Sequence, residues 1–215
     1  MTLVEPAIRA PEAPGGVWRC VLASGNADKL VELRTVLAGL PWELVPQTEL
    51  GVAPAEETAT TFVENAIIKA RHAACLTGLP AIADDSGLEV VALKGAPGVH
   101  SARYGGLGTS DTENVRKLLD EMQGHSLRAA RFRCVAVLVR HPDDPFPVIG
   151  AGTWSGEIAR APRGDRGFGY DPVFWLPRHG CTAAELDIAT KNRISHRARA
   201  LRALRAALDH DEGSG

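Results

Sequence analysis

The chain has 215 residues, with 24 Lys and Arg against 26 Asp and Glu, a formal net charge of −2, and 45% hydrophobic residues. These values are those of an ordinary globular protein that is long enough to bury a sizeable core without disulfides. They exclude a generally basic nucleic-acid binder, because affinity for the DNA or RNA backbone needs an excess of Lys and Arg. Any phosphate site must therefore be local.

The first 17 residues contain Glu, Pro and Gly but neither the basic start nor the apolar stretch of a secretion signal, so we expect a disordered extension there. No apolar run approaches the roughly 18 residues that span a bilayer. The four cysteines form no Cys-x-x-Cys pair, and the seven histidines show no zinc-ligand spacing. We therefore expect a cytoplasmic protein without a membrane or nucleic-acid partner.

Strand-like and helix-like segments alternate along the chain, which indicates a single α/β domain over residues 18–208, followed by a polar tail at 209–215. Residues 19–24 predict a short buried strand. Apolar residues then recur at helical spacing from Ala27 until Gly39 and Pro41 end the helix. Residues 42–45 predict a second strand.

The middle of the chain contains a capped helix followed by acidic residues. The pattern Thr61-x-x-Glu64 predicts a helix start, and Gly78 predicts the end of that helix. Residues 81–83 predict a short strand that ends at Asp84-Asp85-Ser86-Gly87, before residues 88–91 resume an extended pattern. Two carboxylates therefore stand at a predicted strand end.

The second half predicts a mixed sheet, because residues 132–139 have the pattern of a central strand and residues 148–158 that of its antiparallel partner. The turn residues 142–145 join the two strands. The other expected elements are a helix capped by Ser110 and Glu113, a short strand at 173–175 and a last helix at about 195–208.

The first candidate site is Ser24-Gly25-Asn26-Ala27-Asp28-Lys29, where a strand meets a helix. A helix N-terminus offers unpaired N–H groups, and Lys29 adds a full positive charge, which suits a polyphosphate. The segment matches neither a Walker P-loop nor a G-x-G-x-x-G fingerprint. An Asn-capped helix with a solvated lysine is the alternative.

The second candidate is the carboxylate pair Asp84 and Asp85. Neighbouring side chains of an extended segment point to opposite faces, so one of the two should face a ligand. Carboxylates at such a position suit Mg²⁺, which takes one or two of them together with phosphate oxygens. Glu56-Glu57 and Glu64 are candidates for a further carboxylate ligand, and an Asx turn that closes the strand is the alternative.

The third candidate is Gly167-Phe168-Gly169-Tyr170-Asp171-Pro172, in which two aromatic rings lie among glycines before a carboxylate. A base could stack on a ring there, with Asp171 accepting a ring N–H. The alternative is a mobile loop whose aromatics cover a hydrophobic patch.

The fourth candidate is the cluster of donors Lys191, His196 and Arg197 around the start of the last helix. Cations in the first turn of a helix oppose its dipole. His196 and Arg197 are therefore unfavourably placed unless an anionic or carbonyl-bearing partner is present, which favours a functional role.

In this order, these segments resemble the inosine/xanthosine triphosphate pyrophosphatase family over about residues 18–208. The matching segments are Ser24-Gly25-Asn26 with Lys29, Phe62-x-Glu64-Asn65-Ala66 with Lys69-Ala70, Ala83-Asp84-Asp85-Ser86-Gly87-Leu88, Gly95-Ala96-Pro97-Gly98-Val99-x-Ser101-Ala102-Arg103-Tyr104, Gly167 to Pro172, and Ser195-His196-Arg197. One departure is Ser24, where many members have threonine.

The resemblance implies an α/β fold with a long mixed central sheet, flanking helices and two lobes around a nucleotide-binding cleft, in a homodimer. It implies Mg²⁺-dependent hydrolysis of the deaminated purine nucleoside triphosphates ITP, dITP and XTP. The products would be the monophosphate and pyrophosphate. Such an enzyme clears these nucleotides from the nucleotide pool.

The resemblance also implies roles for single residues. Asp85 would accept the proton of the attacking water and bind Mg²⁺, with Glu57 as a further metal contact. Ser86 would touch the substrate. The remaining substrate contacts would be Ser24, Gly25, Asn26, Ala27, Asp28 and Lys29 at the triphosphate, Phe168, Gly169, Tyr170 and Asp171 at the base and sugar, and Lys191, His196 and Arg197 at the keto edge of the purine.

Two other interpretations stay open. Ser86, Asp171 and His196 occur in the chain order of an α/β-hydrolase triad, although the G-x-S-x-G nucleophile elbow is missing. Alternatively, the chain binds modified purines without hydrolysing them.

Overall fold

The computed structural model describes residues 18–24, 27–38 and 42–212. In these residues a seven-stranded sheet has the order β2-β1-β3-β4-β5-β6-β7. The strands are β1 (Trp18–Leu22), β2 (Trp42–Pro46), β3 (Ala81–Val90), β4 (Ala129–Val139), β5 (Val148–Ile158), β6 (Phe174–Leu176) and β7 (Cys181–Thr182). β1 runs parallel to β2 and β3, and the other neighbours are antiparallel, which confirms the predicted mixed sheet.

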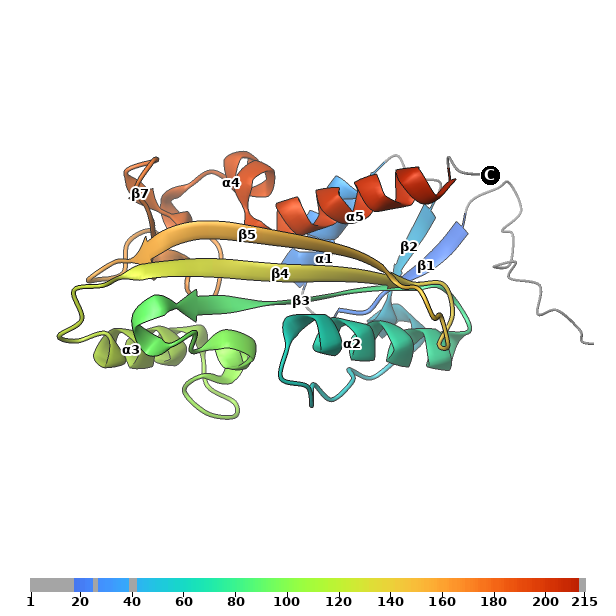
Figure 1. Cartoon of the computed structure of the whole chain (residues 1–215), viewed down its shortest axis with the longest axis horizontal. Coiled ribbons are helices and arrows are strands. Elements are labelled where there is room, and N and C mark those ends of the chain that lie inside the picture. Colours follow the sequence, from blue (N-terminus) through green and yellow to red (C-terminus); the bar gives the residue numbers. More distant parts are fainter. Residues whose placement is uncertain (1–17, 25–26, 39–41, 213–215) are drawn as a thin grey trace, which may run out of the picture.

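Helices cover both faces of the long strands. They are α1 (Ala27–Val36), α2 (Phe62–Thr77), α3 (Asp111–Glu121), α4 (Ile188–Ile194) and α5 (His196–Glu212). Figure 1 shows α2 and α3 on one side of β3, β4 and β5, and α4 and α5 on the other. The α/β class with flanking helices is therefore confirmed, whereas the division into two lobes around a cleft stays a prediction.

The two long helices pack on opposite faces of the sheet with different side chains. On the face that α2 covers, small buried residues of the helix such as Ala66 and Ala70 belong to the same core cluster as Val137 of β4, which lets the helix lie close to the sheet. On the other face, Leu201 and Leu204 of α5 are fully buried against the sheet. Burying each such leucine contributes about 1.5–3 kcal/mol to the stability of the fold, so these side chains hold α5 against the sheet.

The helix starts follow the sequence signals. The Thr61 hydroxyl accepts from the Glu64 N–H at 3.3 Å, and Ser110 with Glu113 forms a complete capping box at the start of α3. Gly78 ends α2 in the left-handed conformation, with φ +68°. The expected end of α1 at Gly39 and Pro41 lies outside the described residues.

Two glycines on β5 allow the backbone of α5 to approach the strand closely. A Cβ atom on Gly150 would overlap the Ala200 carbonyl oxygen, and one on Gly152 would overlap the His196 carbonyl oxygen. The start of α5 can therefore lie directly on the strand. This packing brings His196 and Arg197 onto the sheet surface.

The predicted strand break at the carboxylates is wrong. β3 is continuous from Ala81 to Val90, and Asp84 and Asp85 lie in its middle rather than at an end or in an Asx turn. The turn-forming residues stay extended because β4 pairs with β3 along its whole length. By contrast, β1 pairs only with Ala81 and Ile82, so the carboxylates lie beyond the end of that pairing.

The C-terminal region also differs from the prediction. α5 continues to Glu212, beyond the expected end at Leu208, so part of the expected polar tail is helical. A separate short helix, α4, precedes it, and Ser195 between them is extended with ψ 161°. Within the described residues, no helix is long and apolar enough to cross a membrane.

Candidate active site

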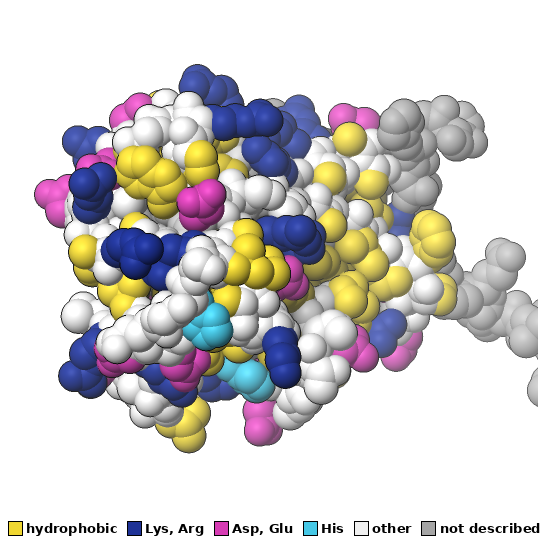
Figure 2. All heavy atoms as spheres, turned by 60° about the vertical axis from the view of Figure 1, so that its left-hand side comes forward, with side chains coloured by type: hydrophobic (Ala, Val, Ile, Leu, Met, Phe, Trp, Pro, Cys, Tyr) yellow, Lys and Arg dark blue, Asp and Glu magenta, His cyan; other side chains and the backbone are white. Residues whose placement is uncertain are grey.

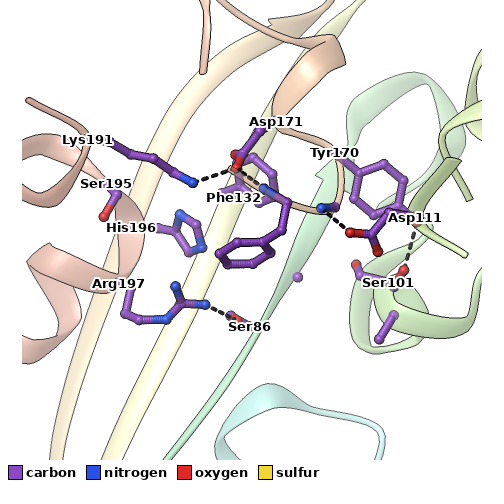
Figure 3. A pocket seen from close by; sticks show the side chains of 14 residues that line it. Ser86, Ser101, Asp111, Phe132, Tyr170, Asp171, Lys191, Ser195, His196 and Arg197 are labelled. Atoms are coloured by element: carbon purple, nitrogen blue, oxygen red, sulfur yellow. Dashed lines mark hydrogen bonds and ion pairs between the residues drawn. The ribbon is translucent and has the colours of Figure 1, made fainter. Parts of the chain in front are cut away.

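One pocket collects many of the predicted substrate contacts (Figure 3). It lies between β3, the junction of α4 and α5, and the loop that precedes β6. The predicted residues that line it are Ser86, Phe168, Gly169, Tyr170, Asp171, Lys191, His196 and Arg197. Side chains more than 100 residues apart in sequence therefore meet in one place.

The loop around Phe168 is held by Asp171. This buried carboxylate accepts from the Phe168 N–H at 2.9 Å and from Lys191 Nζ at 2.5 Å through the same oxygen. Lys191 Nζ lies 4.8 Å from the centre of the Phe168 ring, within the range of a cation–π contact. Asp171 therefore orders both the aromatic ring and the nearby ammonium.

The two aromatic residues of this loop have different environments. Phe168 is half-buried at the pocket. Tyr170 is 4% exposed, and its hydroxyl donates to the Ser101 carbonyl at 2.8 Å. Burial raises the pKa of Tyr170, and the nearby Asp111 charge adds to the rise. Of the two rings, Phe168 is thus the better placed for stacking, and Tyr170 anchors the loop.

Arg197 has a partner inside the protein. Its side chain is 2% exposed, and Nε donates to Asp84 Oδ2 at 3.3 Å while a terminal nitrogen reaches Ser86 Oγ at 3.4 Å. Asp84 therefore offsets the positive charge at the start of α5, which the sequence alone left in conflict with the helix dipole. The guanidinium also lies 5.5 Å from the Phe168 ring.

His196 forms part of an aromatic stack. Its ring lies 4.7 Å from that of Phe132, with 12° between the planes, and His196 is buried. Phe132 also lines the pocket, and sequence reasoning missed it because its strand pattern marked it only as apolar core. The stack fixes the imidazole orientation at the pocket.

A second cluster lies on the other face of β3. Lys69 of α2 donates to Asp85 Oδ1 at 2.9 Å and to Glu57 Oε1 at 2.8 Å. Asn65 Nδ2 reaches the other oxygen of Asp85 at 3.4 Å, and Arg103 lies 3.6 Å from Glu57. Asp84 and Asp85 thus face opposite sides, as the alternation of an extended strand predicts.

Burial alone would lower the pKa of Lys69, but the neighbouring carboxylates, Asp85 first among them, outweigh it and raise that pKa above its ordinary value. Lys69 is therefore a full cation between two carboxylates. No role was predicted for it, although it belongs to one of the segments that carry the family resemblance. The helical spacing alone gave no signal that it faces Asp85.

The acidic residues of this cluster fit a divalent cation only together with other ligands. Among the described residues, no group of three or more His, Cys, Asp and Glu could hold a metal ion. Asp85 and Glu57 nevertheless contact one and the same ammonium, so their oxygens converge on a single cation. Mg²⁺ commonly takes one or two carboxylates and completes its shell with water and phosphate oxygens. The donor set therefore fits Mg²⁺.

The predicted triphosphate segment is described only in part. Ser24 comes two residues after the end of β1, the strand that lies between β2 and β3. Gly25 and Asn26 lie outside the described residues. Ala27, Asp28 and Lys29 form the first turn of α1, and their side chains lie outside the description too. Triphosphate binding at this segment stays a prediction.

Comparison with known proteins gives a consistent result. The Ham1 family profile matches residues 20–207. The chain belongs to the Ham1 family. It is 61% identical over 190 residues to a dITP/XTP pyrophosphatase of Xanthomonas oryzae pv. oryzae, covering 87% of this chain and 96% of that protein. It is 53% identical over 193 residues to the dITP/XTP pyrophosphatase of Vibrio cholerae, covering 89% and 96%.

Solved structures of Ham1 proteins share the fold. The Ham1 protein of Coxiella burnetii is 52% identical with a TM-score of 0.85, covering 91% of this chain and all of that one. The Ham1 protein of Staphylococcus aureus is 40% identical with a TM-score of 0.82, covering 90% and 99%. The open mixed sheet is therefore the fold of this family.

Proposed function

We propose that this chain is a nucleoside triphosphate pyrophosphatase that hydrolyses ITP, dITP and XTP to the monophosphate and pyrophosphate with Mg²⁺. The observation that carries the proposal is the placement of two sites on consecutive residues of β3. Ser86 lines the aromatic pocket, and Asp85 belongs to the Lys69 and Glu57 cluster. The two sites face opposite sides of β3, but β1 pairs with β3 only at the first two residues of β3. A nucleotide with its base in the pocket would extend its phosphates past this edge of β3 toward that cluster.

At the phosphate end, Asp85 orients the attacking water and takes its proton, and the water attacks the α-phosphorus. Asp85 and Glu57 would hold Mg²⁺, which, when bound, offsets the charge of the phosphate oxygens. Lys69 adds a cation beside these carboxylates, and residues from Ser24 to Lys29 hold the leaving pyrophosphate through backbone N–H groups and the Lys29 charge.

At the base end, donors from Lys191, His196 and Arg197 select the substrate. Inosine and xanthosine present an oxygen at C6, whereas adenine presents an amino group that would leave these donors facing another donor. Each unmatched buried donor costs about 1–3 kcal/mol, so two or three cost about 2–9 kcal/mol in total, which corresponds to rejection of adenine nucleotides by roughly 30-fold to more than 10⁶-fold. Phe168 supplies the stacking surface.

The contacts of the rival triad residues favour this proposal. Asp171 is bonded to Lys191, Ser86 contacts Arg197, and His196 stacks on Phe132. A serine hydrolase needs its histidine between the serine and the aspartate instead. The three residues therefore lack the arrangement of a catalytic triad.

We further propose a homodimer that acts in the cytoplasm on free nucleotides, without a nucleic-acid or membrane partner. Basic and acidic side chains are interspersed on the face in Figure 2, which is unlike the single-sign surface of a nucleic-acid binder. Light scattering after gel filtration should give about twice the 22.8 kDa of one chain. A mass of one chain at micromolar concentration would contradict the dimer.

The test of the activity is a nucleotide panel with product analysis. With Mg²⁺, the protein should release pyrophosphate from ITP, dITP and XTP much faster than from ATP, and EDTA should stop the reaction. Release of orthophosphate, or activity that EDTA does not change, would contradict the proposal. Tight binding of ITP without hydrolysis would identify a binding protein instead.

A further inference from the structure

Asp111, the first residue of α3, lines the pocket and forms a hydrogen bond with the loop that contains Phe168. Its Oδ2 accepts from the Gly169 N–H at 2.6 Å, a contact between residues 58 positions apart. Figure 3 shows Asp111 on the side of the pocket opposite Lys191 and His196. The contact therefore connects two walls of the pocket.

The part of the pocket wall that contains Ser101 is held against the sheet by hydrogen bonds. Ser101 lies in a short 3₁₀ helix, η3 (Gly98–Arg103), where its hydroxyl accepts from the Leu88 N–H of β3 at 2.9 Å and donates to the Gly98 carbonyl at 2.6 Å. Its carbonyl accepts the buried Tyr170 hydroxyl. The loop is thus held at Tyr170 by a buried contact and at Gly169 by the exposed Asp111.

The residues around Phe168 need such restraint. Gly167 and Gly169 both have positive φ, +77° and +60°, and glycines lose more backbone freedom on ordering than other residues. Asp171 restrains the Phe168 N–H, and Asp111 restrains the next N–H along the chain. Together they define the peptide units on both sides of the Phe168 Cα.

We propose that Asp111 is a positioning residue for the base: by bonding the Gly169 N–H, it holds the Phe168 ring in the conformation that receives a nucleobase. This inference rests on the proposed function. It requires that Asp111 act through geometry rather than through its charge. An asparagine side chain would keep a carbonyl oxygen at the same place, so Asp111→Asn should retain the bond that Asp111→Ala loses.

The experiment compares Asp111→Ala, Asp111→Asn and the matched control Glu113→Ala. Glu113 is the other acidic residue in the first turn of α3, but it accepts from the Ser110 N–H within the capping box at 2.7 Å. Both alanine variants lose one negative charge from the same helix turn. Glu113→Ala also breaks the capping box and so weakens α3 at least as much as Asp111→Ala, and an effect of such weakening on KM would appear in both variants.

Two readouts are needed. Asp111→Ala should raise KM for ITP about five- to tenfold and change kcat by no more than about twofold. The lost hydrogen bond weakens binding of the base, whereas the reacting phosphate group is not contacted by Asp111. In the nucleotide-free protein, the Gly169 amide should exchange with solvent about tenfold faster. Asp111→Asn and Glu113→Ala should stay within about twofold of the original protein in both measurements.

An Asp111→Asn variant as impaired as Asp111→Ala, or the same KM change in Glu113→Ala, would overturn the positioning role. So would unchanged exchange of the Gly169 amide in Asp111→Ala. The exchange measurement needs no turnover. If the original protein releases no pyrophosphate from any nucleotide, the proposed function fails, whereas the exchange still shows whether Asp111 holds the loop.

Discussion

Asp84 and Asp85 are neighbours in sequence and of one residue type, yet they belong to different environments. The Asp84 side chain is fully buried and pairs with Arg197, which is 2% exposed. The Asp85 side chain is 9% exposed and pairs with Lys69, whose other partner Glu57 is 28% exposed. One ion pair is therefore closed within the protein, and the other opens toward a carboxylate that water and ligands can reach.

The comparison shows how the alternation of one strand separates two roles. Breaking a fully buried ion pair leaves an uncompensated charge, whereas a partly exposed pair is stabilised by water when it separates. Asp84 can therefore hold Arg197 in place, while Asp85 can exchange the Lys69 ammonium for another cation or for a water. The predictions below follow from this difference.

The largest effect is expected for Asp85→Asn. The change keeps the volume but removes the negative charge that the proposed mechanism uses to bind a metal ion and to accept a proton, so kcat for ITP should fall by about 10³-fold or more. Pyrophosphate release measures the loss, and thermal melting should stay within a few degrees. Retention of a tenth of the original kcat would show that Asp85 is not the proton acceptor.

Arg197→Ala tests the buried ion pair between Asp84 and Arg197 through its effect on the free energy of unfolding. The variant leaves the Asp84 charge buried without its guanidinium, so the free energy of unfolding should fall by about 3–5 kcal/mol. Urea unfolding followed by circular dichroism measures this change. A loss below about 1 kcal/mol would mean that the pair is not closed to water as described.

Arg197→Lys sharpens the comparison because it keeps a charge beside Asp84 but loses the planar fork of donors. The ratio of kcat/KM for ITP to that for ATP should fall about 10- to 150-fold, the effect of one charge-assisted hydrogen bond. Equal losses for both nucleotides would instead assign Arg197 to the phosphates that they share.

A third carboxylate, Asp144 in the turn between β4 and β5, should affect stability alone. It accepts from the N–H groups of Arg140 and Phe146, both at 2.9 Å. Burial opposes its charge, but these bonds and the Arg140 charge outweigh it and lower the pKa of Asp144. Asp144→Asn should cost about 1–3 kcal/mol at pH 7 with unchanged kcat.

The pH dependence of this effect has a definite sign. A lowered folded pKa stabilises the protein above the unfolded value of about 3.9, and this contribution disappears as the pH falls through the folded pKa. The difference in unfolding free energy between Asp144→Asn and the original protein should therefore shrink below about pH 4. A difference that stays constant down to pH 2 would contradict the pKa shift.

Sequence reasoning succeeded where the signal is local. The bounds of β5 and the caps at Thr61 and Ser110 follow from residue patterns within a few positions. The continuous β3 was missed because pairing with β4 overrides the turn preference of its Asp-Ser-Gly segment. The short helix α4 was also missed, because its seven residues are too few to display a helical repeat of apolar residues.

The candidate site was predictable to a different degree. The motif residues were found from their chemistry, but their pairing was not, because Asp84 and Arg197 are 113 positions apart. Phe132 and Asp111 gave no functional signal, since one resembles core and the other a helix start. Only the arrangement of the strands and helices brings such residues together.

The most direct test of the division between the two carboxylates is the ratio of kcat/KM for ITP to that for ATP in Asp84→Asn, measured at a temperature at which circular dichroism shows it folded. If Asp84 acts by holding Arg197 at the base, ITP hydrolysis should fall much more than ATP hydrolysis, and the ratio should drop at least about tenfold. A loss as large as that of Asp85→Asn with an unchanged ratio would contradict the account, because it would mean that both carboxylates serve the phosphates.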